Sequence, residues 1–289
     1  MGRHPATLRS VNDADAIIAA AGKASRAVAV GAGFIGLEAA AALTKRGLSV
    51  TVVGARPVPL ERQLGRELGG LLQKVHAEQG VAFRLGRKVV KIKDEGSGTA
   101  VVLDDGESLP ADLVVVGLGI QPATHLLQGL DLNDDGSVTV DRHLRVTEGL
   151  YAAGDVARFP DWRTGEPIRI EHWRLAEQHG RVAAHNLAGR PVEYDGVPFF
   201  WSEQFDLILQ YVGYASTWEE VIFHGELESR NFLAYYAKDN QVLAVAGLAH
   251  DRQLAALSEL MRLNRLPTAE EMRADPEFDP VARLQALQV

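Results

Sequence analysis

The sequence contains no cysteine among its 289 residues. This absence excludes structural disulfides, thiolate zinc sites, iron–sulfur clusters ligated by the chain itself and redox-active dithiols. Any electron chemistry performed by this protein would therefore need a bound cofactor.

Long hydrophobic runs and an excess of positive charge are also missing. No apolar run reaches the roughly 18 residues that a membrane helix needs, and the first residues, MGRHPATLRSVNDADA, lack the apolar core of a signal peptide. The net charge is −8, which argues against nucleic acid or an anionic membrane as a partner. We therefore expect a cytoplasmic protein that acts on small molecules or proteins.

Residues 26–54, RAVAVGAGFIGLEAAAALTKRGLSVTVVG, show the clearest structural pattern. Short apolar runs at 27–30 and 49–53 predict two buried parallel strands. The proline-free segment 34–46 between them is rich in alanine and leucine and predicts a helix, with Gly47 as its stop signal. The segment therefore predicts a β-α-β unit.

Three glycines, Gly31, Gly33 and Gly36, give the spacing G-x-G-x-x-G where the first strand meets the helix. The first glycine permits the tight turn, the second lets the backbone approach a pyrophosphate, and the third allows close packing of helix on strand. The helix N-terminus then faces the phosphates. Because the glycines occur in this structural context, they predict a dinucleotide site rather than a merely structural turn.

The end of the second strand should read the ribose of that dinucleotide. NAD-type sites usually carry an acid there, but this sequence has Gly54, followed by Arg56 and Arg62. The arginines could favour a 2′-phosphate, or they could simply be solvated in a loop. The choice between NADH and NADPH therefore stays open.

The next segments predict a helix over 61–80, a hairpin around Asp105-Gly106 and a buried strand at 113–116. The strand enters a turn with Gly117, Gly119 and Pro122, which either admits a ligand or is an ordinary turn.

Two patterns look like metal sites but do not predict one. The segment from Asp131, DLNDDGSVTVDR, resembles a calcium loop, but Arg142 stands where the bidentate acid belongs, so we expect a turn. His172, His179 and His185 lie seven and six residues apart on a predicted helix, not the four that pairs two metal ligands. We assign no metal.

The part from residue 191 onward predicts short strands joined by turns, with a hairpin at Lys238-Asp239-Asn240, followed by a helix over 251–264. Such an order indicates an α+β module. The aromatic residues Phe199, Phe200, Trp201 and Phe205 either cover a flavin or form core.

Several of these segments together resemble a known family, the FAD-dependent pyridine nucleotide-disulfide oxidoreductases. GAGFIGLEAA is similar to their NAD(P)H fingerprint, LGIQPAT to the turn that leads back to the flavin domain, and TEGLYAAGD to their second FAD motif. IEHWRLAEQHGRVAAHNLAG resembles the helix after that motif, and VPFFWSEQFDLILQYVGYA the C-terminal domain of ferredoxin and rubredoxin reductases and of apoptosis-inducing-factor-like reductases. The motifs keep the family's order over residues 8 to about 265.

This resemblance implies an α/β fold in three parts. They are a Rossmann-like NAD(P)H-binding domain at 8–118, an incomplete return segment of a FAD-binding domain at 119–190, and an α+β C-terminal domain at 191–289. It also implies hydride transfer from NAD(P)H to FAD, and then electron release to a small iron–sulfur or rubredoxin-type acceptor.

The resemblance assigns roles to individual residues. Asp155 would bind the ribityl chain of FAD. Glu38 would lie beside the nicotinamide, or it is a helix acid favoured by the dipole; Trp173 would lie beside the flavin edge, or it is a packed tryptophan at a helix start. The predicted cofactor-binding residues are Gly31, Gly33, Phe34, Ile35, Gly36, Gly54, Arg56, Arg62, Gly119, Gly154, Asp155, His172 and Trp173.

The family carries two glycine fingerprints, whereas this sequence has one. The fingerprint that would hold the FAD pyrophosphate is not among these residues, so we expect another polypeptide to supply the missing half of the flavin domain. The alternative is a truncated, non-catalytic dinucleotide-binding or interaction module.

Overall fold

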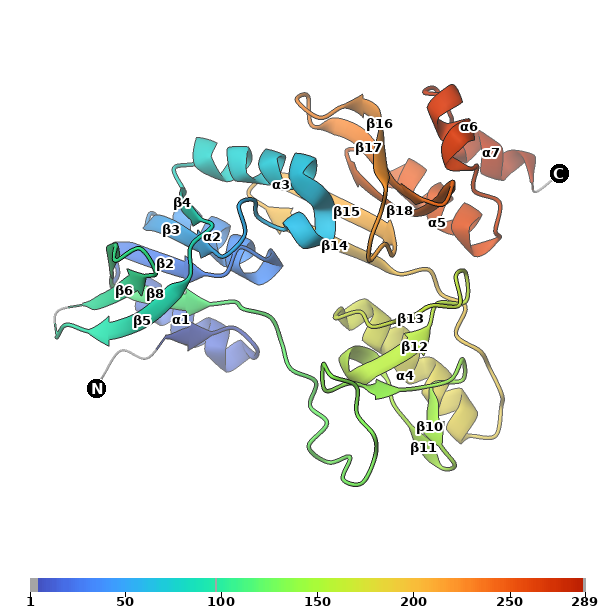
Figure 1. The fold of residues 1–289 in the computed structure, drawn as a ribbon, viewed down its shortest axis with the longest axis horizontal. Helices are drawn as coiled ribbons and strands as arrows, with labels where there is room; N and C mark the ends of the chain where they lie inside the picture. Colours follow the sequence, from blue (N-terminus) through green and yellow to red (C-terminus); the bar gives the residue numbers. More distant parts are fainter. Residues whose placement is uncertain (1–4, 97, 288–289) are drawn as a thin grey trace. The chain divides into compact units, whose positions relative to one another are not determined.

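The computed structural model describes residues 5–96 and 98–287 (Figure 1). It separates two compact units, each made of two chain segments. Unit 1 comprises residues 1–119 and 202–209, and unit 2 comprises residues 120–201 and 210–289. The three-domain division expected from the sequence stays a prediction, but the mixed α/β fold class is confirmed.

Unit 1 is built on a parallel sheet with the strand order β1-β8-β2-β3-β4. These strands span Ala6–Thr7, Leu113–Val116, Arg26–Val30, Ser49–Gly54 and Ala82–Leu85. Both predicted strands of the β-α-β unit are present, and β2 and β3 pair in register from Arg26 opposite Ser49 to Val30 opposite Val53. Residues 27–30 of β2, and Val50, Val52 and Val53 of β3, are buried because the sheet is covered on both faces.

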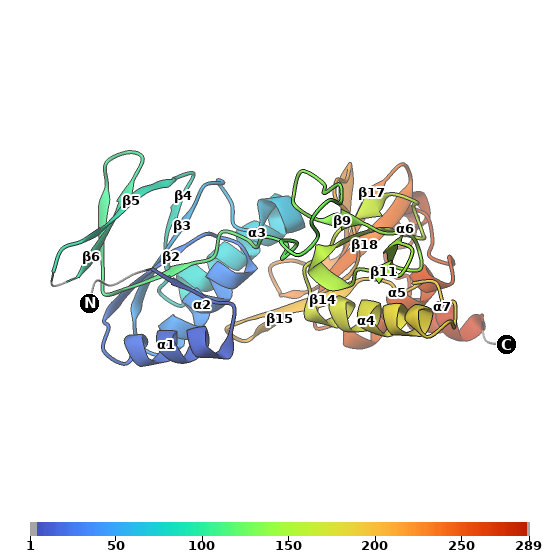
Figure 2. The same ribbon diagram turned by 90° about the horizontal axis from the view of Figure 1, so that it is seen from below.

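Helices cover one face of this sheet and a three-stranded meander covers the other (Figure 2). The helices are α1 (Val11–Ala21) and α2 (Phe34–Lys45), and the meander consists of β5 (Val89–Asp94), β6 (Thr99–Leu103) and β7 (Ser108–Ala111). Val28, Val53 and Val114 of the sheet pack in one cluster with Val101 and Leu103 of the meander. The longer helix α3 (Glu61–Glu78) kinks at Gly65, whose φ is +82°.

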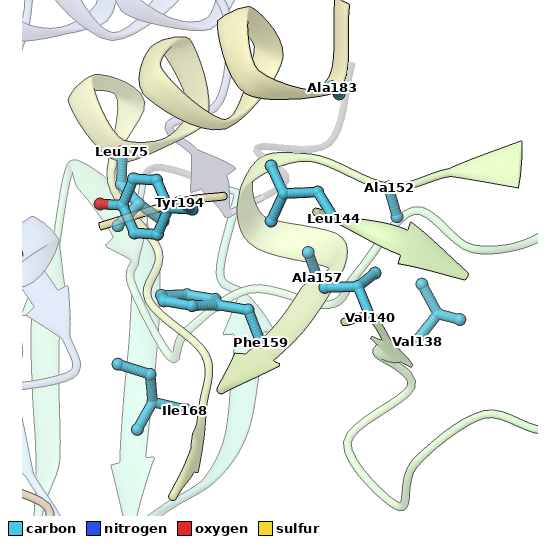
Figure 3. Packing of buried hydrophobic residues seen from close by; sticks show 10 residues of the cluster. All are labelled: Val138, Val140, Leu144, Ala152, Ala157, Phe159, Ile168, Leu175, Ala183 and Tyr194. Atoms are coloured by element: carbon cyan, nitrogen blue, oxygen red, sulfur yellow. The ribbon is translucent and has the colours of Figure 1, made fainter. Parts of the chain in front are cut away.

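Unit 2 begins with small sheets packed against a helix. β12 (Ala157–Pro160) pairs with β9 (Val138–Thr139) and β13 (Pro167–Ile168), while β10 (Arg145–Thr147) pairs with β11 (Leu150–Tyr151). Helix α4 (Trp173–Leu187) contacts the short 3-10 helix η1 (Gly154–Val156). Figure 3 shows Phe159, Leu175 and Tyr194 packed together in the core of this region.

The remaining strands form an antiparallel sheet with the order β14-β15-β18-β17-β16. Its strands span Phe199–Gln204, Leu207–Gly213, Gln241–Leu248, Asn231–Lys238 and Glu220–Glu226, and the helices α5 (Asp251–Arg262), α6 (Ala269–Ala274) and α7 (Pro280–Ala286) follow. Strands β16, β17 and β18 belong to unit 2, whereas residues 202–209, which include the end of β14 and the start of β15, are counted with unit 1. The hairpin predicted between β17 and β18 is confirmed. Asp239 and Asn240 both have positive φ, 51° and 58°, as a two-residue type I′ turn requires.

The segment that resembles a calcium loop is a turn, as expected. Asp135 accepts hydrogen bonds from Ser137 and pairs with Arg158 and Arg169 at 2.9 and 2.7 Å. Across the described residues there is no group of three acidic or histidine side chains that could hold a metal ion. None of the helices within 5–96 and 98–287 is long and apolar enough to cross a membrane. The cytoplasmic location stays a prediction.

Candidate functional site

The glycine fingerprint forms a tight turn between β2 and α2. Gly31 has a φ of +113°, which disfavours any other residue, and its N–H donates to the carbonyl of Val53 at 2.8 Å. A Cβ on Gly31 would lie 2.2 Å from the carbonyl oxygen of Gly117. From the sequence, Gly117 could either admit a ligand or belong to an ordinary turn. The structure places it packed against the fingerprint.

Gly33 faces open space in front of helix α2. It is the N-cap of the helix and, having no side chain, provides no side-chain cap. A Cβ built on Gly33 would meet no atom within 4 Å. The space beside Gly33 at the N-terminus of α2 can thus admit an anion, and this turn fits the pyrophosphate of a dinucleotide. The binding roles of Phe34 and Ile35 stay predictions.

Gly54 ends β3 directly beside this turn. A Cβ on Gly54 would lie 2.7 Å from Cβ of Ala32 and 3.0 Å from a methyl group of Leu85. The strand end therefore has no room for the acid that NAD-type sites usually carry. Its role in reading the ribose stays a prediction.

Arg56 and Arg62 are exposed, one in the loop after β3 and one in the first turn of α3. Neither side chain makes a hydrogen bond or an ion pair with another described residue. The loop is tied to the fingerprint, because the N–H of Leu60 donates to the carbonyl of Ala32 at 3.1 Å. Both guanidinium groups are free to bind a phosphate, and their assignment stays a prediction.

Glu38 lies on the solvent-exposed side of α2, one turn beyond the start of the helix. Ser202 Oγ donates a hydrogen bond of 2.6 Å to Glu38 Oε1. Partial desolvation raises the pKa of the Glu38 carboxyl, the hydrogen bond from Ser202 opposes this shift, and the charge of Glu203 adds to it. The sequence analysis did not identify Ser202 as a site residue. The one sequence feature that could have indicated it is a serine at an inward-facing position of a strand.

The predicted flavin residues in unit 2 gather at η1 and the start of α4. Gly154 has a φ of +79°, and a Cβ there would lie 2.8 Å from Cβ of Ala176 in α4. The half-buried Asp155 carboxylate makes no hydrogen bond or ion pair within the described part of the chain, while its backbone carbonyl accepts from Arg169 at 3.1 Å. A carboxylate held without a partner in η1, between β11 and β12, fits a ligand with hydroxyl groups.

His172 and Trp173 begin the helix that follows. His172 is the N-cap of α4, and its Nδ1 accepts from the N–H of Arg174 at 3.3 Å. Burial and the charge of Arg174 lower the pKa of His172, whereas the charge of Asp155 opposes that shift. Trp173 is 62% exposed, with its ring 5.8 Å from that of Trp201, so it is not the packed core tryptophan of the alternative interpretation.

Two other predicted features have different surroundings. Gly119 is exposed with a φ of +103°, and a Cβ there would meet nothing within 4 Å. The predicted aromatic group divides: Phe205 is buried in unit 1 with its ring 4.9 Å from that of His76, whereas Trp201 lies beside His172 and Trp173 in unit 2. Phe205 is therefore core, and Trp201 is exposed beside the flavin candidates.

Comparison with known proteins agrees with this geometry. Residues 2–180 match the model of the family described as pyridine nucleotide-disulphide oxidoreductase, and residues 199–284 match that described as reductase C-terminal. Apoptosis-inducing factor 3 of Mus musculus is 36% identical over 264 residues, and rhodocoxin reductase of Rhodococcus erythropolis is 34% identical over 275 residues. These alignments cover 90% and 94% of this chain, but only 44% and 64% of the two relatives.

Among solved structures, the ferredoxin reductase for the CYP199A2 system from Rhodopseudomonas palustris matches with a TM-score of 0.89 and 31% identity. The match covers 98% of this chain and 69% of that protein. The family is one of FAD- and NAD(P)H-dependent oxidoreductases. By sequence and by structure, the chain belongs to the pyridine nucleotide-disulphide oxidoreductase family.

Proposed function

We propose that the protein takes part in electron transfer from NAD(P)H through FAD to a small iron–sulfur or rubredoxin-type protein. The printed names of relatives support this proposal, since they include a rhodocoxin reductase and a ferredoxin reductase. Because the chain spans 44% to 64% of the length of the two curated relatives, the activity of the whole protein and its acceptor belong to the proposal.

The observation that carries the proposal is the open N-terminus of α2. Gly31 and Gly36 make the turn, Gly33 leaves space for a ligand, and the helix has no side-chain cap. A pyrophosphate placed there would meet backbone N–H groups and the positive end of the helix dipole. A turn needed only for folding would not require this open space.

When bound, the nicotinamide and the flavin would supply the hydride and electron chemistry. The tasks of the protein are to bind, to orient and to exclude water. In this proposal the backbone at Gly33 binds the dinucleotide, Glu38 orients its nicotinamide half, and the Asp155 carboxylate accepts hydrogen bonds from the flavin's hydroxyl groups. Trp173 offers an exposed ring against which the flavin edge can pack.

Asp155 is not enough to retain FAD by itself. One charge-assisted hydrogen bond contributes about 1.5 to 3 kcal/mol, whereas micromolar affinity needs about 8 kcal/mol. The sequence carries no second glycine fingerprint for the FAD pyrophosphate. We therefore propose that residues outside this sequence complete the flavin site, either in the same polypeptide or in a separate chain.

A second candidate function is a dinucleotide-binding or interaction module without turnover. Its support is that the nucleotide-binding turn at Gly31, Gly33 and Gly36 lies entirely within this sequence, so dinucleotide binding does not itself require a flavin. The two functions differ in whether the protein binds FAD once the missing part of the flavin site is supplied.

The test uses the purified 289-residue chain. Calorimetric titration should show binding of NADH or NADPH, and gel filtration after incubation with FAD should leave the protein colourless. Adding a flavin-fingerprint domain from a relative, in trans or as a fusion, should yield a yellow protein that reduces dyes with NAD(P)H. Absence of binding to either nucleotide would overturn the proposed function, and failure to acquire flavin with that domain would favour the non-catalytic module.

A further inference from the structure

A chain of three hydrogen bonds runs inward from Glu38 through side chains that the sequence places far apart. Ser202 Oγ donates to Glu38 Oε1 at 2.6 Å, Gln204 Nε2 donates to Ser202 Oγ at 3.0 Å, and Gln204 Oε1 lies 2.9 Å from His76 Nε2. All four residues belong to unit 1.

The chemistry of the four groups fixes the direction of every bond. An ionised carboxylate can only accept, so the Ser202 hydroxyl must donate its proton to Glu38. The hydroxyl oxygen then accepts from the amide N–H of Gln204, which turns the amide oxygen toward His76. His76 must therefore carry a proton on Nε2. Burial lowers the pKa of His76, which favours the neutral ring with this proton as its only one.

The inner members of the chain are rigidly held. Ser202, Gln204 and His76 are all buried, and the turn between β14 and β15 is fixed on α2 because Lys45 Nζ donates to the carbonyl oxygen of Phe205 at 2.7 Å. The Phe205 ring packs edge-on against the ring of His76. Ser202 therefore reaches Glu38 from a fixed position.

Glu38, in contrast, is the one exposed member, on the same helix whose N-terminus faces the open space at Gly33. A glutamate on a helix surface normally samples several rotamers, and ordering it costs free energy when a ligand binds. The bond from Ser202 removes part of this cost in advance while leaving the second carboxylate oxygen available. That oxygen cannot approach the pyrophosphate, because like charges repel; the groups that suit it are the hydroxyl and amide donors of the nicotinamide ribose and carboxamide.

We propose that Ser202 is a positioning residue that sets the Glu38 carboxylate for hydrogen bonding to the nicotinamide-riboside half of the dinucleotide, with Gln204 and His76 holding Ser202 in place. This inference rests on the proposed function, since it assumes that the dinucleotide binds at α2. Under this proposal, strand β14 contributes to nicotinamide binding through Ser202.

The test compares two probes by calorimetry on the full chain. NADH or NADPH, whichever binds more tightly, carries the nicotinamide-riboside half, and ADP lacks it. Ser202→Ala should weaken binding of the dinucleotide about fivefold and leave ADP affinity unchanged. Asp206→Ala, at an exposed position of the same β14–β15 turn, is the matched control and should change neither affinity.

A double-mutant cycle separates positioning from general damage to the fold. If Ser202 acts through Glu38, Ser202→Ala should have no further effect in a Glu38→Ala background. Glu38→Ala by itself, at an exposed helix position, should reproduce the selective loss even where Ser202→Ala folds poorly. Equal loss for both probes, or no loss for the dinucleotide, would overturn the inference while leaving the proposed function intact; a wild-type chain that binds neither probe would overturn both.

Discussion

The carbonyl oxygen of Gly31 lies 1.9 Å from the position that a Cβ on Gly36 would occupy. The first and third fingerprint glycines are therefore required by the packing of helix α2 against the turn, whether or not a ligand is bound. Gly33 differs, because a side chain there would meet only open space. Packing therefore requires glycine at Gly31 and Gly36, whereas the remaining fingerprint position, Gly33, borders open space that a ligand could occupy.

This difference predicts that Gly33→Val abolishes dinucleotide binding without unfolding the protein. The extended backbone at Gly33, with a φ of −89° and a ψ of −175°, accommodates valine, but the side chain would occupy the space of the pyrophosphate. We expect NADH and NADPH affinity, measured by titration calorimetry, to fall at least about tenfold, which corresponds to about 1.4 kcal/mol.

Gly70→Ala provides the control, since Gly70 lies within α3 and a Cβ there also meets nothing within 4 Å. It should keep full affinity and gain about 0.5 to 1 kcal/mol of stability, the usual difference between alanine and glycine in a helix. Equal nucleotide affinity in wild type and Gly33→Val would show that the site lies elsewhere.

Arg56 gives a prediction about cofactor choice. Arg56→Ala should lower NADPH affinity severalfold more than NADH affinity, because a guanidinium group binds a 2′-phosphate and has little to bind on a 2′-hydroxyl. Arg66→Ala is the control, since Arg66 is already paired with Glu61 at 2.8 Å. A ratio of the two affinities that stays constant in Arg56→Ala and in Arg56→Ala/Arg62→Ala would mean that both arginines are simply solvated. Gly54 is unsuited to this test, because its surroundings exclude any side chain.

The parts of the site that the sequence predicted are those in which neighbouring residues build the structure. β2, the fingerprint turn, α2 and β3 follow one another within residues 26–54, so periodicity and glycine spacing determine them locally. The same holds for the hairpin at Asp239-Asn240, where both residues adopt positive φ.

The parts that the sequence did not predict depend on contacts between distant segments. Ser202 lies 164 residues from Glu38, and Gln204 lies 128 residues from His76, so no local pattern joins them. Phe205 stands next to flavin candidates in the sequence, yet it packs on His76, because the chain reverses direction between β14 and β15. Nor does composition show that Ala32 and Leu85 close the space around Gly54.

The ion pair between Asp161 and Arg163 predicts a large effect on stability. Their side chains are only 3% and 11% exposed, and Arg163 also donates to the carbonyl of Leu243 at 3.0 Å. Arg163→Met would leave the Asp161 carboxylate buried without a cation, so we expect a loss of about 3 to 5 kcal/mol in the free energy of unfolding by urea. Arg181→Met removes an exposed pair with Glu177 and should cost less than about 1 kcal/mol. Similar losses in the two variants would contradict this account of the buried pair.

His179 predicts how stability depends on pH. It is fully buried between Phe159 and Tyr194, and its Nδ1 accepts from the N–H of Gly154 at 3.3 Å. Burial lowers the pKa of His179 from 6.5 to about 4. A proton on Nδ1 would remove the acceptor and place a charge among apolar rings, so the folded state excludes it.

Because the folded pKa is depressed, the unfolded chain binds the proton at a pH where the folded chain does not, and stability must fall as the pH is lowered through the unfolded value. Between about pH 6.5 and pH 5, where most carboxylates stay ionised, this group should remove about 1.5 kcal/mol from the free energy of unfolding. His179→Gln keeps an acceptor for Gly154 but cannot titrate. Between pH 6.5 and pH 5, the free energy of unfolding of this variant should therefore fall by about 1.5 kcal/mol less than that of the wild type, whatever its stability at neutral pH. Urea unfolding of both proteins at both pH values measures how the free energy of unfolding changes with pH in each. If the free energy of unfolding changed equally with pH in wild type and His179→Gln, His179 would already bind its proton in the folded protein. The hydrogen bond from Gly154 would then not hold the ring neutral.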